Sequence, residues 1–523
     1  MNTIENNLRF NKWLTRFIIA YVLLTFLMTV LLFAEEKPNI VYILVDDLGY
    51  GDVNLGIKNL NRFNNPNIET PNLAKLAKES IVFTQHYAAS PVCSPSRAGL
   101  LTGRIPMRLN ITNWIEDRIS EKNKKTNQYL LDEEITIAEV CKQAGYETAI
   151  FGKWHLNGAD WENKENWEKE IGSFPNHQGF DFGLVSKENP HLTRFLMANS
   201  QKNPGDFFNL HGNPIGTIKG YSSGIITDSA ITWIRKKRNR SKPFFLYLPY
   251  DAVHECIFNP DEYDKMFDTG NANKDFYYAN IRYLDDQIGR LLEYLESEGL
   301  SKNTIIFFSS DNGPAVLRGY FGTFRSYGTS YPLYGQKRQI LEGGIRVPGM
   351  IRWPDKIIPR ISEEPNSTLD VFPTICEIVE QTIPDDRKID GVTMIPHLLY
   401  DNPIKRVEPI YWQYENTGNW NSYGKGYNRR LHGNEPINDR PKYNVSIRKG
   451  NYVLRGVQER KFELPTKYLL FDVVNDQNEK YNLTIKNENL YKNMKISLEN
   501  LFLDVNNERI ISFKKMNKLS SIN

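Results

Sequence analysis

Short apolar runs rich in β-branched residues alternate with amphipathic segments through the first two thirds of the chain. Each run predicts a strand buried on both faces, because a strand with one solvated face would alternate apolar and polar residues. Strands that alternate with helices are typical of a mainly parallel sheet. The predicted strands are residues 39–45, 81–87, 146–151, 244–248 and 304–309, and the predicted helices are residues 70–77, 95–101, 135–144, 221–235, 276–297 and 369–379.

The pattern changes near residue 400, where shorter segments with strand-like alternation and turn residues begin. Lys449 and Gly450 predict a hairpin turn between two of them. We therefore predict a small α+β domain over residues 401–523 after a larger domain over residues 35–400, and long loops over residues 157–215. The C-terminal strands are expected at residues 409–414, 443–448, 451–455 and 468–473, with a helix at residues 491–503.

A basic N-terminus precedes an apolar segment at residues 17–33. This order is typical of a secretory signal peptide, which we predict over residues 1–34. The apolar run is also nearly long enough to span a bilayer, so an uncleaved membrane anchor is the alternative. In either case we expect the rest of the chain to lie outside the cytoplasm, as a secreted, periplasmic or lysosomal protein.

Composition narrows the possible classes of protein. The 523 residues are 40% hydrophobic and 24% charged, which is ordinary for a globular protein with a large core. A formal net charge of +3 offers no electrostatic reason to bind nucleic acid. The four cysteines form no C-x-x-C pair, which argues against a zinc site or a disulfide scaffold.

Polar residues gather where the predicted strands end. In parallel α/β sheets, ligands bind beyond the carboxyl ends of the strands. Each residue alone is compatible with a turn, a cap or a solvated position, but together they predict one crowded polar site. These residues are Asp46 and Asp47, Lys153 and His155, His254, and Asp311 and Asn312.

Two adjacent carboxylates, Asp46 and Asp47, directly follow a strand that is predicted to be buried. Burying two negative charges is costly unless a cation or hydrogen-bond donors neutralise them. Carboxylate oxygens are hard ligands, and they suit Ca²⁺ or Mg²⁺. The sequence therefore indicates a cation site at the end of the first strand.

A cysteine lies in the segment Cys93-Ser94-Pro95-Ser96-Arg97, beyond the second predicted strand. Ser94 suits a helix cap and Pro95 a first helical position, so we predict that a helix begins there. A cysteine at a helix N-terminus, with Arg97 one turn away, lies in a positive field that favours an anionic oxygen or a thiolate. For an isolated cysteine, the alternative is a buried structural role.

The pattern C-x-P-x-R, followed by Ala-x-Leu-Leu-Thr-Gly-Arg, resembles the signature of the type I sulfatases. Lys337, followed by Glu-Gly-Gly-x-Arg-x-Pro at residues 342–348, resembles the same family, and residues 325–328 resemble its arylsulfatase A and N-acetylgalactosamine-6-sulfatase branch. The resemblance implies an alkaline-phosphatase-like fold, in which helices sandwich a large mixed, mainly parallel sheet. A smaller α+β C-terminal domain would follow.

The resemblance also implies a modified nucleophile and a metal. In type I sulfatases the motif cysteine is oxidised to formylglycine, and its hydrated aldehyde attacks sulfur. Carried over to this chain, Cys93 would be the modified residue. Asp46, Asp47, Asp311 and Asn312 would bind Ca²⁺, with Mg²⁺ as the other possibility, and the modified Cys93 would lie beside the ion.

Five further side chains receive roles from the resemblance. Arg97 would hold the hydrated aldehyde, and Lys153 and Lys337 would bind the sulfate oxygens. His155 would take a proton from the second hydroxyl and so expel sulfate. His254 would bind sulfate or protonate the leaving alcohol.

The expected activity is hydrolysis of a sulfate monoester, on a sulfated saccharide or another small sulfate ester, after a maturation enzyme has generated the formylglycine. One alternative is a phosphodiesterase or phosphonate hydrolase of the same superfamily, which often uses additional His and Asp ligands for transition metals. Another is a catalytically silent, sugar-binding relative. The presence of every expected polar residue argues against a silent protein.

Overall fold

The computed structural model describes residues 13, 15–19, 36–57, 65–115, 125–158, 173–186, 207–211, 213–216, 218–255, 257–315, 326–414 and 443–522. Residues Asn39–Asn523 form one compact unit, and residues Met1–Pro38 form another. The predicted signal peptide falls almost entirely outside these ranges and stays a prediction. Within them, no helix combines the length and the apolar character that a membrane crossing requires.

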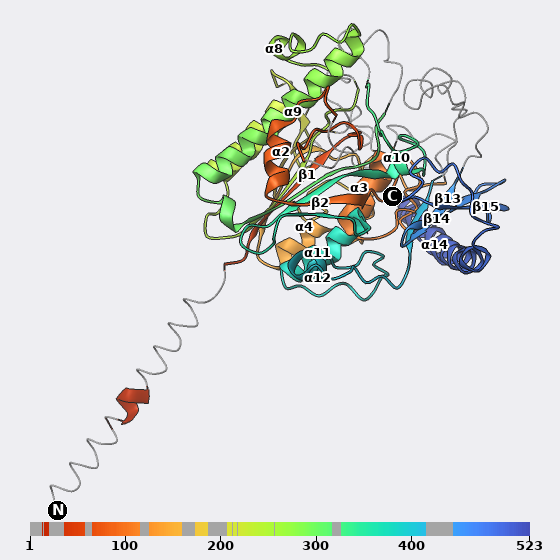
Figure 1. The fold of residues 1–523 in the computed structure, drawn as a ribbon. Helices are drawn as coiled ribbons and strands as arrows, with labels where there is room; N and C mark the ends of the chain where they lie inside the picture. Colours follow the sequence, from red (N-terminus) through yellow and green to blue (C-terminus); the bar gives the residue numbers. More distant parts are fainter. Residues whose placement is uncertain are drawn as a thin grey trace, which may run out of the picture. The chain divides into compact units, whose positions relative to one another are not determined.

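An 11-stranded mixed sheet forms the centre of the larger unit (Figure 1). Strand β1 (Asn39–Val45) lies between β7 (Phe244–Pro249) and β8 (Thr304–Ser310), and β3 (Glu147–Lys153) pairs with β7. All four strands are parallel, so their carboxyl ends lie at one edge of the sheet. This arrangement confirms the predicted parallel centre.

The outer strands make the sheet mixed. Strand β9 (Arg346–Arg352) runs antiparallel both to β8 and to β2 (Ile81–Tyr87). Strand β4 (Phe182–Ser186) pairs with β3 inside the stretch that we predicted as loops, so that prediction was wrong there. The remaining strands are β5 (Phe207–Phe208), β6 (Pro214–Gly216), β10 (Arg360–Ser362) and β11 (Asn366–Ser367).

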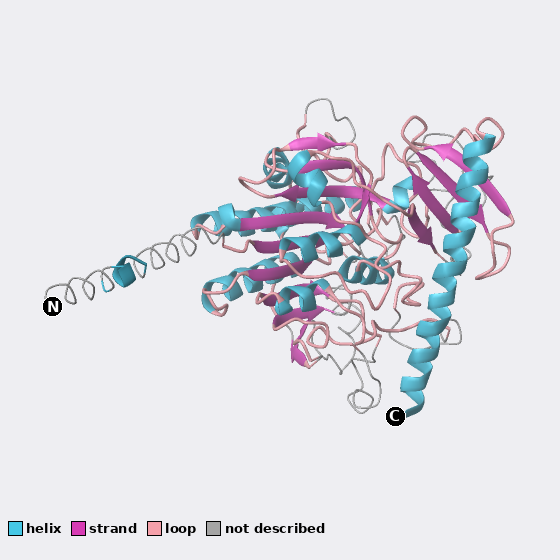
Figure 2. Cartoon of the chain, turned by 90° about the horizontal axis from the view of Figure 1, so that it is seen from below, coloured by secondary structure: helices cyan, strands magenta, loops and turns pink. Residues whose placement is uncertain are grey.

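Helices cover both faces of this sheet (Figures 1 and 2). Ile40, Tyr42 and Leu44 of β1 enter one hydrophobic cluster, and Val41, Ile43 and Val45 enter another. Because side chains alternate along a strand, the two clusters lie on opposite faces. The first cluster includes residues of α3 (Cys93–Thr102), α4 (Ile137–Gln143), α11 (Val371–Ile378) and α12 (Ile395–Tyr400), and the second includes residues of α2 (Pro71–Lys78), α7 (Ser222–Lys236) and α9 (Ala272–Ser297).

Helix α3 begins at the cysteine, two residues before the predicted first position. Val92 is the N-cap residue, and it makes no side-chain cap. The Ser94 hydroxyl, which we predicted as the cap, instead accepts a hydrogen bond from the Ile115 backbone N–H at 3.0 Å. Cys93 therefore lies in the first helical turn, and its neighbour Ser94 holds a second segment against it.

A smaller antiparallel sheet and one long helix form the C-terminal region (Figure 2). The four predicted strands are confirmed, and Gly450 adopts a φ of 57° in the predicted hairpin turn. The predicted helix extends far beyond residue 503, to Ile522. The boundary at residue 401 stays a prediction. The elements are β12 (Ile410–Gln413), β13 (Val445–Lys449), β14 (Tyr452–Val457), β15 (Lys467–Asp472) and α14 (Glu488–Ile522).

A buried carboxylate ties the two sheets together. Glu342 opens α10 (Glu342–Ile345), and its carboxylate accepts hydrogen bonds from the hydroxyl of Tyr87 on β2 (2.6 Å) and the guanidinium of Arg455 on β14 (3.2 Å). Burial opposes its ionisation, but Arg448 and two other arginines hold the pKa of Glu342 below its usual value. The motif residue that we associated with the family therefore joins the main sheet to the C-terminal sheet.

Glu342→Gln is expected to lower the free energy of unfolding by about 3 kcal/mol, because it leaves buried arginines without their counter-charge. Urea denaturation measures the loss. Glu79→Gln is the matched control, since Glu79 is about half exposed and pairs with Arg352 at the surface, where such pairs contribute about 1 kcal/mol or less. Equal denaturation midpoints for the two variants would contradict the assignment.

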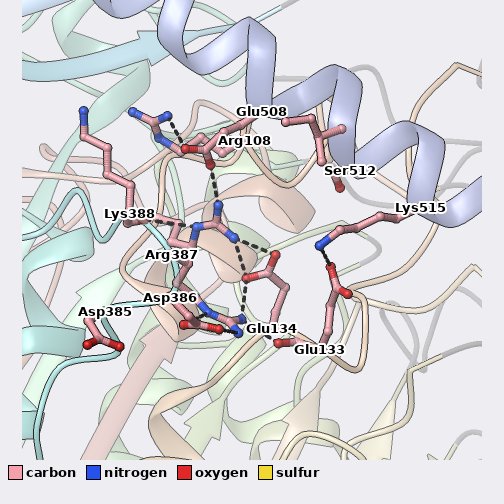
Figure 3. Close-up of a pocket in the computed structure, with 12 residues that line it drawn as sticks. Arg108, Glu133, Glu134, Asp385, Asp386, Arg387, Lys388, Glu508, Ser512 and Lys515 are labelled. Carbon is pink, nitrogen blue, oxygen red and sulfur yellow. Dashed lines mark hydrogen bonds and ion pairs between the residues drawn. The ribbon is translucent and has the colours of Figure 1, made fainter.

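A charged cavity of about 600 Å³ lies beside α14 (Figure 3). Five acidic and five basic side chains line it, and four of the acidic ones, Glu133, Glu134, Asp386 and Glu508, pair with basic side chains of the lining. Arg104 bonds Glu134 at 2.6 Å and Glu508 of α14 at 2.5 Å, while Arg108 bonds Asp504 at 2.6 Å. With its charges matched in this way, the cavity lining holds α14 against the larger part of the molecule.

Candidate active site

The polar residues predicted from the strand ends do converge. Val45 and Ser310 are paired residues at the ends of β1 and β8, so Asp46 and Asp311 leave the sheet side by side. Lys153 is the last residue of β3, and His254 follows β7. The four parallel strands therefore deliver carboxylates, an amine and an imidazole to one edge of the sheet.

Asp46 is the central carboxylate of this site. It accepts hydrogen bonds from the Cys93 thiol (3.3 Å) and from Lys153 Nζ (2.5 Å), and Arg97 Nη2 lies 3.4 Å from its Oδ2. Its complete burial favours the neutral acid, but the charge of Lys153 and the other surrounding cations hold the pKa of Asp46 well below its usual value. Asp46 is therefore an anion.

Asp47 gathers a second set of partners. Lys337 Nζ lies 2.7 Å from its Oδ1 and 2.8 Å from its Oδ2, and the Asn312 amide donates to Oδ1 at 2.7 Å. Asp47 has a φ of 62°, a left-handed conformation that is uncommon for a residue other than glycine. A backbone strained in this way at a polar cluster is typical of a functional site.

Arg97 and Asp311 form a fully buried ion pair in the site. The Nε and Nη2 atoms of Arg97 both donate to Asp311 Oδ2, at 3.0 and 2.8 Å, and Nη1 donates to the Lys153 carbonyl at 2.8 Å. Asp311 Oδ1 accepts from the Asp47 backbone N–H at 3.2 Å. Burial and the nearby Asp46 charge raise the pKa of Asp311 to about 6 despite Arg97.

The environment of Cys93 differs from the sequence prediction. Burial, followed by the charges of Asp311 and Asp46, raises the pKa of the Cys93 thiol well above its usual value. The predicted effect of the helix N-terminus and Arg97 is outweighed, because the guanidinium is already neutralised by the carboxylates. The encoded residue is therefore a neutral thiol and a poor nucleophile.

The two histidines are neutral bases. Burial and the nearby charge of Lys153 lower the pKa of His155 well below its usual value, and its Nε2 donates to the Ile115 carbonyl at 3.2 Å. Burial and Lys337 lower the pKa of His254 to about 4. Because Nε2 of His155 carries the hydrogen, its Nδ1 is the ring atom that can take a proton.

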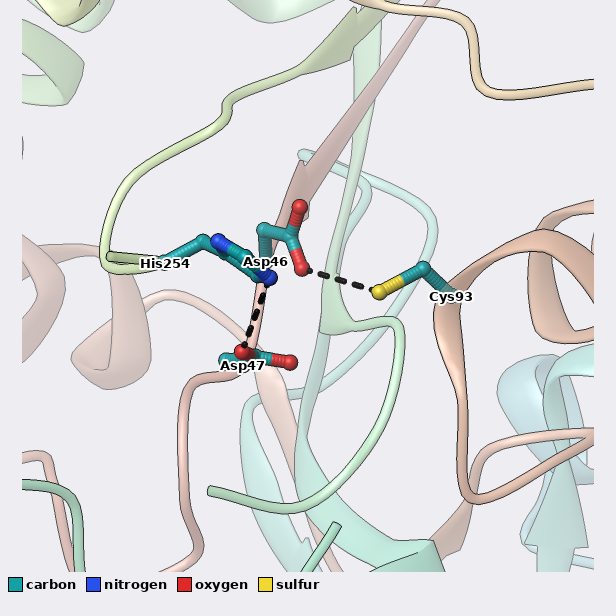
Figure 4. Close-up of side chains that lie close together, drawn as sticks. All are labelled: Asp46, Asp47, Cys93 and His254. Atoms are coloured by element: carbon teal, nitrogen blue, oxygen red, sulfur yellow. Dashed lines mark hydrogen bonds and ion pairs between the residues drawn. The ribbon is translucent and has the colours of Figure 1, made fainter. Parts of the chain in front are cut away.

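The carboxylate and amide oxygens of the site fit a hard cation, whereas the Cys93 thiol and the His254 imidazole in the same cluster are softer ligands. One ligand atom from each of Asp46, Asp47, Cys93 and His254 lies within 4.8 Å of the others (Figure 4). The Oδ1 of Asn312 is buried and has no hydrogen-bond partner within the described ranges, although such oxygens are normally satisfied. Anionic and amide oxygens in this arrangement suit Ca²⁺ or Mg²⁺.

His254 contributes an acceptor atom to the same cluster. Its Nδ1 donates to the Glu255 carbonyl at 2.6 Å, so in the neutral ring Nε2 is an acceptor. That atom lies 3.6 Å from Asp47 Oδ2, another acceptor (Figure 4). The Lys337 ammonium, 2.8 Å from the same Asp47 oxygen, supplies positive charge beside these two atoms.

Three side chains beside this cluster, Trp114, Arg338 and Tyr414, were not predicted from the sequence. The guanidinium of Arg338, next to Lys337, stacks on Trp114 with 4.4 Å between its carbon and the ring centre. Tyr414 lies within electrostatic reach of Lys337 and Cys93. Arg338 could have been predicted from its position next to Lys337 in the family motif. Trp114 and Tyr414 could not, because neither follows a strand that ends in polar residues.

Comparison with known proteins agrees with the geometry. The Sulfatase family model matches residues 38–380. The chain is 32% identical to N-acetylgalactosamine-6-sulfatase of Rattus norvegicus over 391 residues, which are 73% of this chain and 70% of the relative. It is 30% identical to the uncharacterized sulfatase YdeN of Escherichia coli (strain K12), with 92% of this chain and 89% of the relative covered.

A solved structure supports the same fold. Ps i-CgsB in complex with k-i-k-neocarrahexaose superposes with a TM-score of 0.69 at 26% sequence identity, over 90% of this chain and 93% of that chain. The family match spans well over half of the chain and contains the whole cluster from Asp46 to Lys337. The chain therefore belongs to the sulfatase family and is a sulfuric ester hydrolase.

Proposed function

We propose that this sulfatase removes sulfate from a sulfated saccharide, using a formylglycine made from Cys93 and a bound Ca²⁺. The observation that carries the proposal is the position of Cys93 in the first turn of α3. Its sulfur lies 3.3 Å from Asp46 Oδ1, the carboxylate that also pairs with Lys153 and Arg97. The saccharide is supported by the relatives, one named for N-acetylgalactosamine-6-sulfate and one bound to a neocarrahexaose.

The charges of the site suit an anionic ester. Three carboxylates, Asp46, Asp47 and Asp311, are matched by Arg97, Lys153 and Lys337. A divalent cation held by Asp46, Asp47, Asp311 and Asn312 would supply two more positive charges and stabilise negative charge on the sulfate oxygens. The site would then be positive overall and would attract a sulfate group.

The side chains divide the chemistry between them. An oxidised residue 93 would supply a hydrated aldehyde with one hydroxyl to attack sulfur and a second whose deprotonation releases sulfate. Lys153 and Lys337 bind the sulfate oxygens, and Arg97 holds residue 93. His155, neutral and with Nδ1 able to accept, takes the proton of the second hydroxyl.

His254 would serve the leaving group. Its neutral imidazole lies beside Asp47 and is about one fifth exposed, at the open side of the cluster. Once Nε2 carries a proton, which the negative charge of Asp47 beside it favours, His254 would bind sulfate or protonate the departing alcohol. Acid–base groups of this kind act through direct contact with the reacting atoms.

Maturation would precede folding. Cys93, Pro95 and Arg97 are all buried in the folded chain, so a maturation enzyme reading this motif needs the segment before α3 is packed. The basic and then apolar N-terminus supports export of the chain, and export would place the enzyme outside the cytoplasm.

Comparison of matched aryl esters tests the activity. 4-Nitrophenyl sulfate is expected to be hydrolysed far faster than 4-nitrophenyl phosphate by protein made with its maturation enzyme. The reverse preference would favour a phosphodiesterase or phosphonate hydrolase. A protein with the aldehyde and bound metal that hydrolyses neither ester would instead be a silent sugar-binding relative.

The metal is expected to be calcium. Elemental analysis of purified protein should find about one calcium per chain and no stoichiometric zinc, because oxygen ligands dominate the site. Removal of calcium with a chelator should lower the melting temperature, and adding back Ca²⁺ at 100 times its Kd should restore about 2.7 kcal/mol of stability. Stoichiometric zinc, or a melting temperature that ignores Ca²⁺, would overturn the assignment.

Lys337→Ala is expected to lower kcat about 10²-fold, the scale for losing one preorganised group that stabilises developing charge. Kinetics with 4-nitrophenyl sulfate measure this loss. Lys142→Ala is the control, because Lys142 pairs with Asp181 in an exposed ion pair on α4. If Lys337→Ala weakened only the binding of large substrates, Lys337 would be a rim residue instead.

A further inference from the structure

An arginine stacked on an aromatic ring lies beside Lys337, which is proposed to bind the reacting sulfate. Arg338 follows Lys337, and its guanidinium carbon is 4.4 Å from the centre of the Trp114 ring. Both side chains are partly exposed, whereas Asp47 and Lys337 next to them are buried. The pair therefore lies at the open side of the site, where a substrate extends beyond its reacting sulfate.

Backbone contacts fix this pair relative to the reacting residues. The Arg338 N–H donates to the carbonyl of Pro91, two residues before Cys93, at 2.8 Å. On the other side, Ile115, next to Trp114, donates its N–H to Ser94 Oγ at 3.0 Å and accepts a hydrogen bond from His155 at 3.2 Å. Arg338 and Trp114 are each anchored within two residues of the nucleophile position.

The backbone of Arg338 is held in an uncommon conformation. Its φ of 71° is left-handed, a region that residues with a side chain rarely adopt. Such strain persists only where the surroundings impose it, and it occurs at functional sites more than elsewhere. This conformation turns the chain directly after Lys337, so the side chains of Lys337 and Arg338 occupy different parts of the site.

Two polar side chains, Asn113 and Tyr414, lie beside Trp114, which packs against the cluster that contains Tyr414. The Tyr414 hydroxyl donates to Asn113 Oδ1 at 3.3 Å, and Trp114 donates its backbone N–H to the same oxygen at 2.9 Å. Burial raises the pKa of Tyr414, so the phenol stays neutral while Arg338, Lys337 and Cys93 lie within electrostatic reach of it. We name Asn113, Trp114, Arg338 and Tyr414 the Arg338 subsite.

We propose that the Arg338 subsite binds a second anionic group, a sulfate or a carboxylate, on the saccharide whose sulfate ester is hydrolysed. The proposal rests on the proposed function and extends it to substrate class. A guanidinium presents a rigid fork of donors that matches the oxygens of either anion. Lys337 is proposed to bind the reacting sulfate. The Cα atoms of consecutive residues are only about 3.8 Å apart, so Arg338 reaches a neighbouring group on the same ligand.

Competition against hydrolysis of 4-nitrophenyl sulfate tests this subsite. The competing saccharides are N-acetylgalactosamine 6-sulfate, N-acetylgalactosamine 4,6-disulfate and a uronic-acid-containing disaccharide 6-sulfate. In the wild-type enzyme, the better of the two doubly charged saccharides should inhibit at least about 10-fold more strongly than the singly charged one, the scale of a charged hydrogen bond. The stronger inhibitor identifies the second anion as sulfate or carboxylate.

Variants assign the preference to Arg338. Arg338→Gln should reduce the preference to near one and weaken its salt dependence, and Arg338→Lys should retain part of it, because the charge remains but the fork is lost. Arg238→Gln is the matched control. Arg238 also stacks on an aromatic ring, with its guanidinium carbon 5.3 Å from the centre of the Phe244 ring. Phe244 is the first residue of β7, so this pair lies at the edge of the sheet opposite the site.

A preference that is absent in the wild-type enzyme, or that survives in Arg338→Gln, would overturn the proposal. Should Arg338→Gln fail to fold in a thermal melt, an undiminished preference in Arg338→Lys would also overturn it. Failure of the proposed function would look different, because aldehyde-bearing, metal-loaded wild-type protein would then hydrolyse no sulfate ester at all.

Discussion

Cys93→Ala is expected to abolish hydrolysis of sulfate esters while the protein remains folded. The proposed nucleophile is an oxygen that only the oxidised residue carries, and burial together with Asp311 and Asp46 keeps the encoded thiol protonated. Cys93→Ser should be equally inactive in a host whose maturation enzyme accepts only cysteine. Kinetics with 4-nitrophenyl sulfate and a thermal melt measure the two properties separately.

Cys141→Ala provides the matched control for this result. Cys141 is also a buried cysteine, and burial likewise raises its pKa well above the usual value, but it lies in α4 within a hydrophobic cluster. This variant should keep its activity and lose only stability.

Mass spectrometry of the peptide that bears residue 93 tests the modification directly, and an aldehyde there should react with hydrazine reagents. Pro95→Ala should reduce the aldehyde fraction, because the motif would no longer be complete. Full activity in protein whose residue 93 is an unmodified, alkylatable thiol would disprove the mechanism.

Asp311→Asn is expected to lower kcat by about 10³-fold or more, at the upper end of the effect of removing one electrostatic group from an active site. Asp311 is a proposed metal ligand, and its carboxylate also receives both the Nε and Nη2 hydrogen bonds of Arg97. The amide cannot neutralise the guanidinium, so Arg97 would lose its position beside residue 93. Bound calcium, measured by elemental analysis, should fall as well.

Asp285→Asn distinguishes this effect from a loss of stability. Asp285 is another buried carboxyl that accepts backbone hydrogen bonds, from Asn72 at 2.9 Å and Leu73 at 2.8 Å, at the start of α2. Its variant should melt at a lower temperature yet retain kcat. Near-normal turnover of folded Asp311→Asn would exclude Asp311 from the site.

Most of the fold could be predicted because its local signals agree with its tertiary structure. The run at residues 39–45 is apolar at nearly every position, and β1 is buried on both faces between parallel neighbours. Boundaries were less accurate where tertiary contacts decide them. Ser94 has the chemistry of a helix cap, but its hydroxyl bonds Ile115 from a distant segment, and α3 begins at Cys93.

The long C-terminal helix shows the same limit. We predicted a helix that ends at residue 503, and isolated helical segments are only marginally stable in water. In the folded chain, Asp504 and Glu508 pair with Arg108 and Arg104 beside the charged cavity, and these contacts hold the helix in place. A local sequence pattern cannot predict ion-pair partners that lie about 400 residues away in the chain.

The sequence by itself determined the family, the parallel centre of the sheet and the set of polar residues at its edge. A cysteine motif is local, and the carboxyl ends of parallel strands must meet, so Asp46, Lys153 and Asp311 could be grouped without coordinates. Only the tertiary structure decided how these charges are shared. Asp46 receives Lys153 and the Cys93 thiol, whereas Arg97 is held chiefly by Asp311, because sheet register and burial set distances that spacing along the chain does not contain.

The tertiary structure alone also revealed the surroundings of two residues in one motif. Glu342 belongs to the segment that resembles the family, yet its carboxylate is enclosed by side chains from both sheets. Arg338 lies four residues earlier and stacks on Trp114 at the open side of the site. Sequence shows which groups are present, but whether a charge is enclosed or exposed depends on which distant segments pack against it.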